Sequence, residues 1–229
     1  MSRVRDLTIA VIPCLDEAGR VGAVVRGLSG TVSRILVVDD GSSDGTAAEA
    51  GSAGATVLRH SKPLGKGAAL AAGWRRAREL GGEWMLMLDG DGQHDPAEAP
   101  AFIAAAETGA RLVVGNRMPG SRAMPVVRRW TNRWMSRRIS ALAGLEVPDS
   151  QCGYRLVHLP SLEALALRCR GYEIESEMTV AFARAGHPMA FVPVRVRYGG
   201  ERSKISPLRD TARWFRWYLR TRSAQDGRR

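Results

Sequence analysis

The first half of the sequence alternates short apolar runs with segments whose apolar residues recur every three or four positions. The short runs are typical of buried strands, and the three-to-four rhythm is typical of amphipathic helices. The pattern predicts strands at Thr8–Cys14, Arg34–Asp39, Thr56–Arg59, Trp84–Leu88 and Arg111–Val114. Between them it predicts helices at Ala18–Leu28, Asp44–Ala53, Lys66–Leu80 and Pro96–Thr108. This alternation indicates βαβ units, and therefore an α/β fold with a mostly parallel sheet flanked by helices.

The second half of the chain is less regular. It predicts a basic helix with tryptophans at Met124–Leu142, a loop and strand within Asp149–Val157, a helix at Tyr172–Arg184, a strand at Met189–Arg197 and an amphipathic C-terminal helix at Pro207–Arg222. No linker, internal repeat or low-complexity tract interrupts these segments. We therefore expect one domain over residues 1–222, followed by a flexible tail at residues 223–229.

Polar loops follow three of the predicted strands directly, at Pro13–Glu17, Asp39–Thr46 and Asp89–His94. In open α/β sheets, ligands bind outside the carboxyl ends of the strands. We therefore expect these three loops to converge on one site.

The charge composition narrows the choice of partner. The 229 residues include 34 Lys and Arg against 23 Asp and Glu, a formal net charge of +11. Such an excess favours anionic partners, whether nucleic acid, anionic lipid or phosphorylated substrates. No zinc finger, helix-turn-helix or RNP signature is present, so we expect no nucleic-acid partner.

Cysteine usage and hydropathy bear on the compartment. Cys14, Cys152 and Cys169 are scattered without metal-binding spacing, which favours reduced thiols in a cytosolic protein. No stretch approaches the ~18 apolar residues of a membrane-spanning helix. The apolar run after Arg3 and Arg5 is short and lacks a cleavage site, so it predicts a first strand rather than a signal peptide. Any contact with a membrane is therefore expected at its surface.

The segment Asp89-Gly90-Asp91-Gly92-Gln93 is the strongest candidate for chemistry. Two carboxylates at positions i and i+2, just past a buried strand, can hold Mg²⁺ or Mn²⁺, and the cation can bridge two phosphates of a ligand. The glycines allow the backbone to approach that ligand closely. A solvated Gly-Asp turn would use the same residues, so this segment alone leaves both interpretations open.

The other two loops add polar groups. Asp40 can accept hydrogen bonds from a nucleobase, whereas Ser43 or Asp44 can cap the following helix. Pro13-Cys14-Leu15-Asp16-Glu17 ends the first strand. Taken singly, each loop is compatible with a capped turn.

Taken together, the loops resemble one family, the family 2 glycosyltransferases with the GT-A fold. The resemblance rests on P-x-x-[N/D]-E at residues 13–17, VDDGSSDGT at 38–46 and LDGDGQ at 88–93, in this order and spacing. Further agreement comes from GKG at 65–67, GNR at 115–117, DSQCGYR at 149–155, EIESE at 173–177 and RSK at 202–204. The resemblance covers roughly residues 7–207. Within the family, LDGDGQHDP and DxxCGYR look most like dolichol-phosphate-mannose synthases and bacterial polyprenyl-phosphate relatives.

The resemblance implies a metal-dependent hexosyltransferase with Mg²⁺ or Mn²⁺ as its cofactor, built on a GT-A (Rossmann-like) sheet. It implies a nucleotide-sugar site made of Pro13, Leu15, Glu17, Val38, Asp40, Lys66, Asp89, Gly90, Asp91, Gln93, Arg117, Arg202 and Lys204. The implied metal and diphosphate ligands are Asp89, Asp91 and Gln93, with Asp91 the firmest metal ligand. The implied phosphate-neutralising residues are Arg117, Arg202 and Lys204.

Two segments depart from the family pattern. Leu15 and Asp16 stand where the family commonly has Tyr-Asn. The GGERSK run is one residue longer than the usual R-x-x-G-x-S-K, so either Arg197 or Arg202 can correspond to the family's arginine.

Two classes of acceptor stay open for a GDP-mannose, UDP-glucose or UDP-GlcNAc type of donor. A polyprenyl phosphate, dolichyl or undecaprenyl, is ionised near neutral pH, because phosphomonoesters lose their second proton around pH ~6. It needs no strong base, and in-line attack predicts inversion at the anomeric carbon. A saccharide or other hydroxyl acceptor requires a carboxylate base. The candidates are Asp149, Glu175 and Glu177, which could instead pair with arginines. The expected catalytic set is Asp89, Asp91, Arg117, Asp149 and Glu175.

Two helical segments combine basic and aromatic residues. In the C-terminal helix, one face carries Arg209, Arg213, Arg216 and Arg220, and an adjacent face carries Leu208, Ala212, Phe215 and Leu219. The earlier segment places Arg129, Arg133 and Arg137 beside Trp130 and Trp134. This composition suits helices that lie in a membrane surface. The alternative is that both helices pack on the sheet with their arginines in water. We expect a cytoplasmic enzyme, peripheral on the cytoplasmic face of the membrane. The prediction also allows a separate membrane-protein partner.

Overall fold

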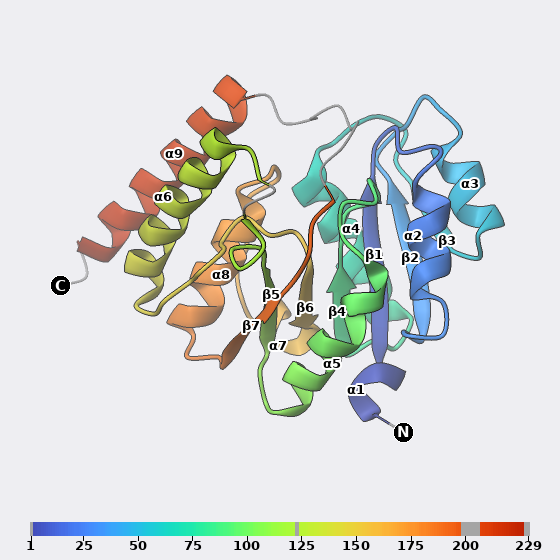
Figure 1. The fold of residues 1–229 in the computed structure, drawn as a ribbon, viewed down its shortest axis with the longest axis horizontal. Coiled ribbons are helices and arrows are strands. Elements are labelled where there is room, and N and C mark those ends of the chain that lie inside the picture. The colour runs from blue at the N-terminus through green and yellow to red at the C-terminus, as the bar shows by residue number, and fades with distance from the viewer. Residues whose placement is uncertain (1, 122–123, 198–206, 227–229) are drawn as a thin grey trace.

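A computed structural model of the protein describes residues 2–121, 124–197 and 207–226. One seven-stranded sheet lies at its centre, in the order β3-β2-β1-β4-β6-β5-β7 (Figure 1). The strands are β1 (Thr8–Cys14), β2 (Arg34–Asp39), β3 (Thr56–Arg59), β4 (Trp84–Met87), β5 (Leu112–Asn116), β6 (Arg155–His158) and β7 (Met189–Pro193). Neighbouring strands pair in parallel, except that β6 runs antiparallel to both β4 and β5. The prediction of a mostly parallel α/β sheet is confirmed.

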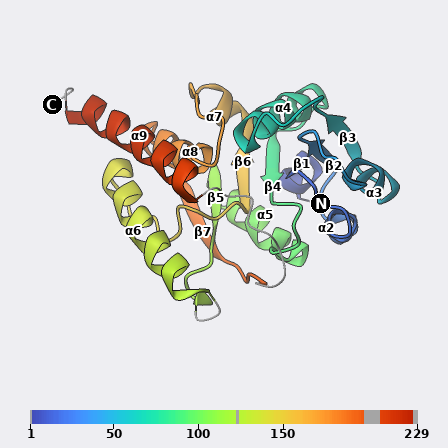
Figure 2. The same cartoon turned by 90° about the horizontal axis from the view of Figure 1, so that it is seen from above.

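Helices cover both faces of this sheet, with α4 and α7 on one side and α2 and α5 on the other (Figure 2). The helices are α1 (Arg3–Asp6), α2 (Val21–Leu28), α3 (Thr46–Ser52), α4 (Lys66–Glu79), the 3₁₀ turn η1 (Pro96–Glu98), α5 (Ala99–Glu107), α6 (Val126–Ala143), α7 (Leu159–Glu163), α8 (Ile174–Arg184) and α9 (Pro207–Asp226). Across the described ranges, no helix combines the length and the apolar composition that crossing a membrane requires.

The core follows from the continuous apolar runs of the central strands. β1 and β4 are buried on both faces, as expected for parallel strands covered by helices. Gly73 allows α4 to lie directly on β1, because a Cβ at this position would stand 2.3 Å from Cγ1 of Val11. This close packing of α4 brings its first residue, Lys66, to the carboxyl edge of the sheet.

The structure refines several predicted boundaries. α2 begins at Val21 rather than Ala18, because the preceding residues form a loop that is hydrogen-bonded to the loop after β2. β7 ends at Pro193, and only an isolated bridge between His94 and Val196 continues its direction within the described chain. α9 continues to Asp226, four residues beyond the predicted end of the C-terminal helix.

A second, smaller apolar cluster lies beyond the β7 edge of the sheet. It joins α6, α8 and α9 through Ile139, Leu142, Val180, Trp214 and Tyr218. α6 and α9 therefore pack against α8 and against each other, and Phe191 of β7 is the part of the sheet that contacts this cluster (Figure 1).

Candidate active site

The three polar loops after β1, β2 and β4 do converge. Thr46 Oγ1 accepts a hydrogen bond from the Glu17 backbone at 2.7 Å, and Asp44 accepts one from the backbone of Ala18 at 3.1 Å. The third loop joins them at Gly90, where a Cβ would stand 2.4 Å from Sγ of Cys14. Gly90 is therefore required for the acidic turn to reach the end of β1.

The acidic turn presents two carboxylates with different partners. Asp89 lies 2.7 Å from Nζ of Lys66, whereas Asp91 accepts a hydrogen bond from the backbone of Gln93 at 3.0 Å. Burial alone would raise the pKa of Asp89, but the positive charge of Lys66 holds it below its ordinary value. Asp89 is therefore ionised and held by a cation of the protein itself.

Lys66 links the acidic turn to α8. Its Nζ also lies 2.7 Å from Oε1 of Glu175, and its ammonium stands over the ring of Tyr172. Burial lowers the pKa of Lys66, but the charges of Asp89 and Glu175 outweigh burial and raise it above its ordinary value. The sequence assigned Lys66 to the nucleotide-sugar; the structure places its ammonium between two carboxylates, at the centre of the site.

Gly153 leaves the space for this cluster. A Cβ at residue 153 would stand 2.9 Å from Oδ2 of Asp89, 3.1 Å from Oε1 of Glu175 and 3.2 Å from Nζ of Lys66. Any larger residue would push at least one charged group away. The glycine of the CGYR segment is therefore part of the charge geometry.

Asp91 has the character of a cation ligand. Its burial and the nearby negative charges of Asp89 and Glu17 raise its pKa to about 6, so a positive ion beside it would favour its ionised form. Carboxylate and amide oxygens are the ligands that Mg²⁺ and Mn²⁺ prefer, and Gln93 adds an amide oxygen to the same turn. The donor set of Asp91, Gln93 and Asp89 thus fits a divalent cation. No cluster of three or more His, Cys, Asp or Glu with metal-binding geometry occurs within residues 2–121, 124–197 and 207–226.

Arg117 and Asp149 form a buried ion pair opposite the acidic turn. Oδ2 of Asp149 accepts from Nε of Arg117 at 2.6 Å, and Oδ1 accepts from Nη2 at 2.8 Å. The same carboxylate also accepts from Asn132 and from the backbones of Arg117 and Gln151. Burial alone would raise the pKa of Asp149, but its bonds to Arg117 lower it. Asp149 therefore orients Arg117, one of the two roles that its sequence position allowed.

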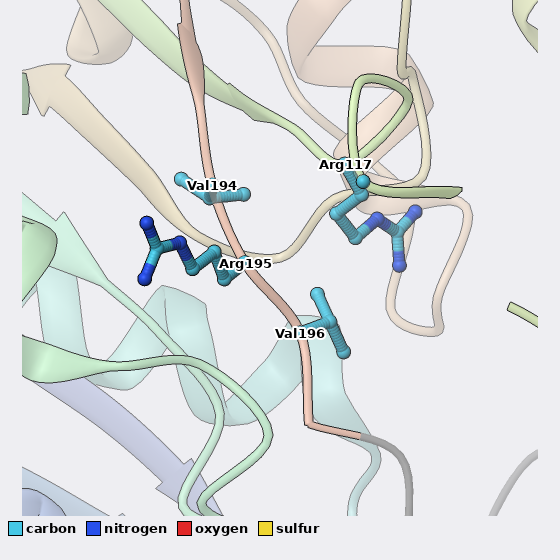
Figure 3. A pocket seen from close by; sticks show the side chains of 5 residues that line it. Arg117, Val194, Arg195 and Val196 are labelled. Atoms are coloured by element: carbon cyan, nitrogen blue, oxygen red, sulfur yellow. The ribbon is translucent and has the colours of Figure 1, made fainter. Parts of the chain in front are cut away.

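A cavity of about 190 Å³ adjoins Arg117 and is lined by Gly120, Val194, Arg195 and Val196 (Figure 3). Figure 3 shows Arg117 and Val196 near the same space, whereas the side chain of Arg195 points to the other side of the chain. Arg117 is close enough to the acidic turn to lower the pKa of Asp89. The cavity therefore combines a fixed guanidinium with apolar walls beside the candidate cation site.

The region after β2 and β3 holds a second, more open cavity of about 360 Å³, lined by Gly41, Ser42, Arg59, His60 and Ser61. Asp40 holds the residues around this cavity in place. Its carboxylate pairs with Nδ1 of His60 at 2.7 Å and accepts hydrogen bonds from the backbone amides of Leu64 and Gly65. Nucleobase binding by Asp40 stays a prediction. His60, which the sequence pattern did not single out for a role, lines the cavity.

The other predicted nucleotide residues have different environments. Pro13 and Leu15 are half-buried at the end of β1, and Glu17 is paired with Arg20 at 2.8 Å. Val38 is fully buried and packs beside Gly73 of α4, so a ligand could contact only its backbone. Arg202 and Lys204 lie outside the described residues.

Arg155 is part of the DSQCGYR motif, but the sequence predicted no role for it in the site's framework. Arg155 is fully buried in β6 and donates to the carbonyl oxygens of Ser150, Cys152 and Glu175 and to Oγ1 of Thr179. It therefore ties the loop before β6 to the start of α8. The signal in the sequence that could have indicated this role is an arginine at the start of an apolar strand.

The sheet order, the acidic turn and the arginine held by Asp149 are features of one class of enzymes, the GT-A glycosyltransferases. Among solved structures, glucosyl-3-phosphoglycerate synthase from Mycobacterium tuberculosis, in complex with Mn²⁺, UDP and phosphoglyceric acid, shares this fold with a TM-score of 0.73. It is 24% identical in sequence, and the match covers 96% of this chain and 78% of that chain.

The family model of glycosyl transferase family 2 matches residues 9–165, and this chain belongs to that family. An undecaprenyl-phosphate mannosyltransferase from Micrococcus luteus is 32% identical over 199 residues, covering 81% of this chain and 82% of the relative. A polyprenol monophosphomannose synthase from Mycolicibacterium smegmatis is 29% identical over 210 residues, covering 84% of this chain and 78% of the relative. The predicted family and fold are confirmed.

Proposed function

We propose that this enzyme transfers a hexose from a GDP- or UDP-sugar to a polyprenyl phosphate, with inversion at the anomeric carbon. The observation that carries this proposal is that each of the three candidate bases is already held by another group of the protein. Asp149 is bound to Arg117, and Glu175 is bound to Lys66. Glu177 accepts hydrogen bonds from the backbones of Arg168 and Cys169. A hydroxyl acceptor needs a carboxylate free to take its proton, whereas an ionised phosphate does not.

The cavity at Arg117 fits such an acceptor. Its guanidinium can form paired hydrogen bonds to a phosphate, and Asp149 already fixes its orientation. Val194 and Val196 supply apolar surface for the first carbons of the lipid. The two relatives named above are a polyprenyl-phosphate mannosyltransferase and a polyprenol monophosphomannose synthase, and they support the same acceptor class.

The donor would lie between the two cavities. Asp91, Gln93 and Asp89 would hold a divalent cation, and the Mn²⁺ complex of the structural relative supports this assignment. When bound, the cation supplies positive charge that stabilises the departing nucleoside diphosphate. Lys66 orients Asp89, and Arg117 adds positive charge on the acceptor side. Positioning of both phosphates in line with the anomeric carbon is the protein's main contribution.

A polyprenyl phosphate presents its headgroup at a bilayer surface. We therefore place the reaction at the cytoplasmic face of the membrane, with the enzyme bound peripherally. A separate membrane-protein partner is compatible with this arrangement.

The test is an incubation of the purified protein with labelled GDP- and UDP-sugars, Mn²⁺ or Mg²⁺, and a polyprenyl phosphate in detergent. We expect label in the lipid fraction with one donor, loss of transfer on adding EDTA, and recovery on adding excess Mn²⁺. Donor hydrolysis with no lipid labelling would instead favour a saccharide or other hydroxyl acceptor, the alternative that remains. Transfer that persists in EDTA would refute the cation assignment.

Lys66→Met is expected to make the protein more responsive to Mn²⁺. The substitution removes the ammonium that neutralises Asp89 and Glu175, so the remaining carboxylates gain more from an added divalent cation. We expect a lower melting temperature without metal and a larger Mn²⁺-induced rise than in the wild type. Lys62→Met, an exposed position on the loop before α4, is the matched control. Equal Mn²⁺-induced rises in the wild type and Lys66→Met would count against Lys66 as the competing cation.

A further inference from the structure

The outer face of α6 and α9 concentrates the exposed apolar side chains of the molecule. Seven large hydrophobic side chains are exposed within the described residues, and six of them belong to these two helices. They are Val126, Val127, Trp130 and Trp134 of α6 with Phe215 and Leu219 of α9. We call these six residues the α6–α9 surface. Val127 is 78% exposed and Trp130 is 65% exposed, so neither side chain contributes to the fold's own core.

The two helices present these side chains as one surface. The rings of Trp134 and Phe215 stack with centroids 6.0 Å apart and planes 10° apart. Val126, Trp130 and Trp134 follow at intervals of four along α6, and Phe215 and Leu219 do so along α9. Such intervals keep residues on one side of a helix. The stack therefore joins two apolar stripes into a continuous patch.

α9 buries one pair of large side chains and leaves a second pair exposed. Trp214 and Tyr218 fill the small core against α8, and the indole of Trp214 donates to Oγ of Ser176 at 3.0 Å. Phe215 and Leu219, one position further along, remain outside. The helix is thus anchored by one pair of large side chains and presents a second pair to its surroundings.

The same two helices carry a large share of the protein's net positive charge. α6 has five arginines and no acidic residue, and α9 has five arginines and two aspartates. Ten arginines less two aspartates give +8, out of +11 for the whole chain. Two copies meeting through this surface would bring these like charges together, which opposes self-association. An anionic partner with an apolar interior satisfies both features of the surface.

We infer that the α6–α9 surface docks on an anionic lipid bilayer, with its arginines at the headgroups and Trp130, Val127 and Phe215 in the outer acyl region. Aromatic and aliphatic residues beside arginines on helix faces are the composition that binds bilayer interfaces. Both helices begin at the end of the molecule where the strands lead to the candidate site (Figure 1). This inference rests on the proposed function only for the identity of the acceptor, because the docking itself requires no polyprenyl phosphate.

The test is flotation of the full chain with vesicles of phosphatidylcholine containing phosphatidylglycerol and no polyprenyl phosphate. We expect binding that grows with phosphatidylglycerol content and weakens with NaCl. The double variant Val127→Ser/Trp130→Ser should bind at least about tenfold more weakly, because it removes two exposed apolar groups. Arg133→Gln should weaken binding roughly fivefold through loss of one headgroup contact. Leu64→Ser removes the large exposed hydrophobic side chain that, among the described residues, lies outside this surface, and this variant should bind as the wild type does.

Circular dichroism will show that the double variant is folded, and sugar transfer to detergent-dispersed polyprenyl phosphate should stay within about twofold of the wild type. Equal flotation of the wild type and the double variant would overturn the inference, and so would equal binding to neutral and anionic vesicles. A wild type that does not float but dimerises, with a monomeric double variant, would assign the surface to a second copy of the chain instead. Because these vesicles contain no acceptor, failure of docking and failure of the proposed reaction are distinguishable.

Discussion

Asp91→Asn is expected to lower the rate of sugar transfer at least about 100-fold, while the protein stays folded. The substitution keeps the size of the side chain but removes the negative charge that a divalent cation would neutralise. Burial and the charges of Asp89 and Glu17 already raise the pKa of Asp91 to about 6, so the folded protein gains nothing from this charge without a cation. We therefore expect an unchanged or slightly higher melting temperature in the absence of metal. The measurement is initial transfer rate at saturating donor, together with thermal unfolding with and without Mn²⁺.

The matched control for this prediction is Asp6→Asn, an isosteric change at an exposed residue of α1. It should leave both the rate and the Mn²⁺-induced rise in melting temperature unaltered. Asp91→Asn should lose that rise as well as the activity. Retention of more than a tenth of the wild-type rate by Asp91→Asn would show that this carboxylate is not the principal ligand of the cation.

Asp149→Ala is expected to destabilise the fold by about 3–5 kcal/mol, because it leaves the guanidinium of Arg117 buried without its partner. The carboxylate is fully buried and accepts two hydrogen bonds from that guanidinium, one from Asn132 and one from each of two backbone amides. Activity should fall too, because Arg117 loses its fixed orientation beside the cavity. Urea unfolding monitored by tryptophan fluorescence gives the free energy of unfolding.

Glu163→Ala provides the comparison, since it breaks an arginine–carboxylate pair with Arg78 at the surface. Its cost should stay below about 1 kcal/mol. If Asp149→Ala instead lost turnover with a comparably small cost in stability, Asp149 would act on the substrate directly. The proposed phosphate acceptor would then give way to a hydroxyl acceptor that requires this base.

These two predictions follow from one electrostatic arrangement. Asp91 and Asp89 are neighbouring negative groups, Lys66 lies between Asp89 and Glu175, and Arg117, paired with Asp149, is close enough to Asp89 to lower its pKa. Within that arrangement Asp91 is the carboxylate whose pKa is raised to about 6, whereas Asp89 and Asp149 have lowered pKa values. Of these three carboxylates, Asp91 is therefore expected to gain the most from a bound divalent cation.

Sequence patterns predicted the local structure of the first half closely. β1, β2 and β3 have the predicted bounds, and the three loops after β1, β2 and β4 meet as expected. These features depend on short-range properties: apolar runs long enough for one buried strand, and polar residues where the strand leaves the sheet. The short helices α1 and α7 were not predicted, since a helix of four or five residues carries too little periodicity to detect.

The sequence could not show which charged residues form ion pairs with one another. Lys66 and Glu175 are 109 positions apart, and Arg117 and Asp149 are 32 apart, yet each pair is in direct contact. β6, running antiparallel between β4 and β5, brings the CGYR segment back to the acidic turn. No local pattern encodes that insertion, because strand order depends on long-range packing of complete elements.

The sequence by itself determined the α/β class, the family and the acidic turn of this protein, because strand and loop signals and motif order are written in consecutive residues. The tertiary structure alone decided that Lys66 lies between two carboxylates, that Asp149 orients Arg117, and that α9 buries Trp214 while exposing Phe215. Both side chains of that last pair are aromatic and adjacent in sequence. The positions of α6 and α8 beside α9 determine which of them reaches the core.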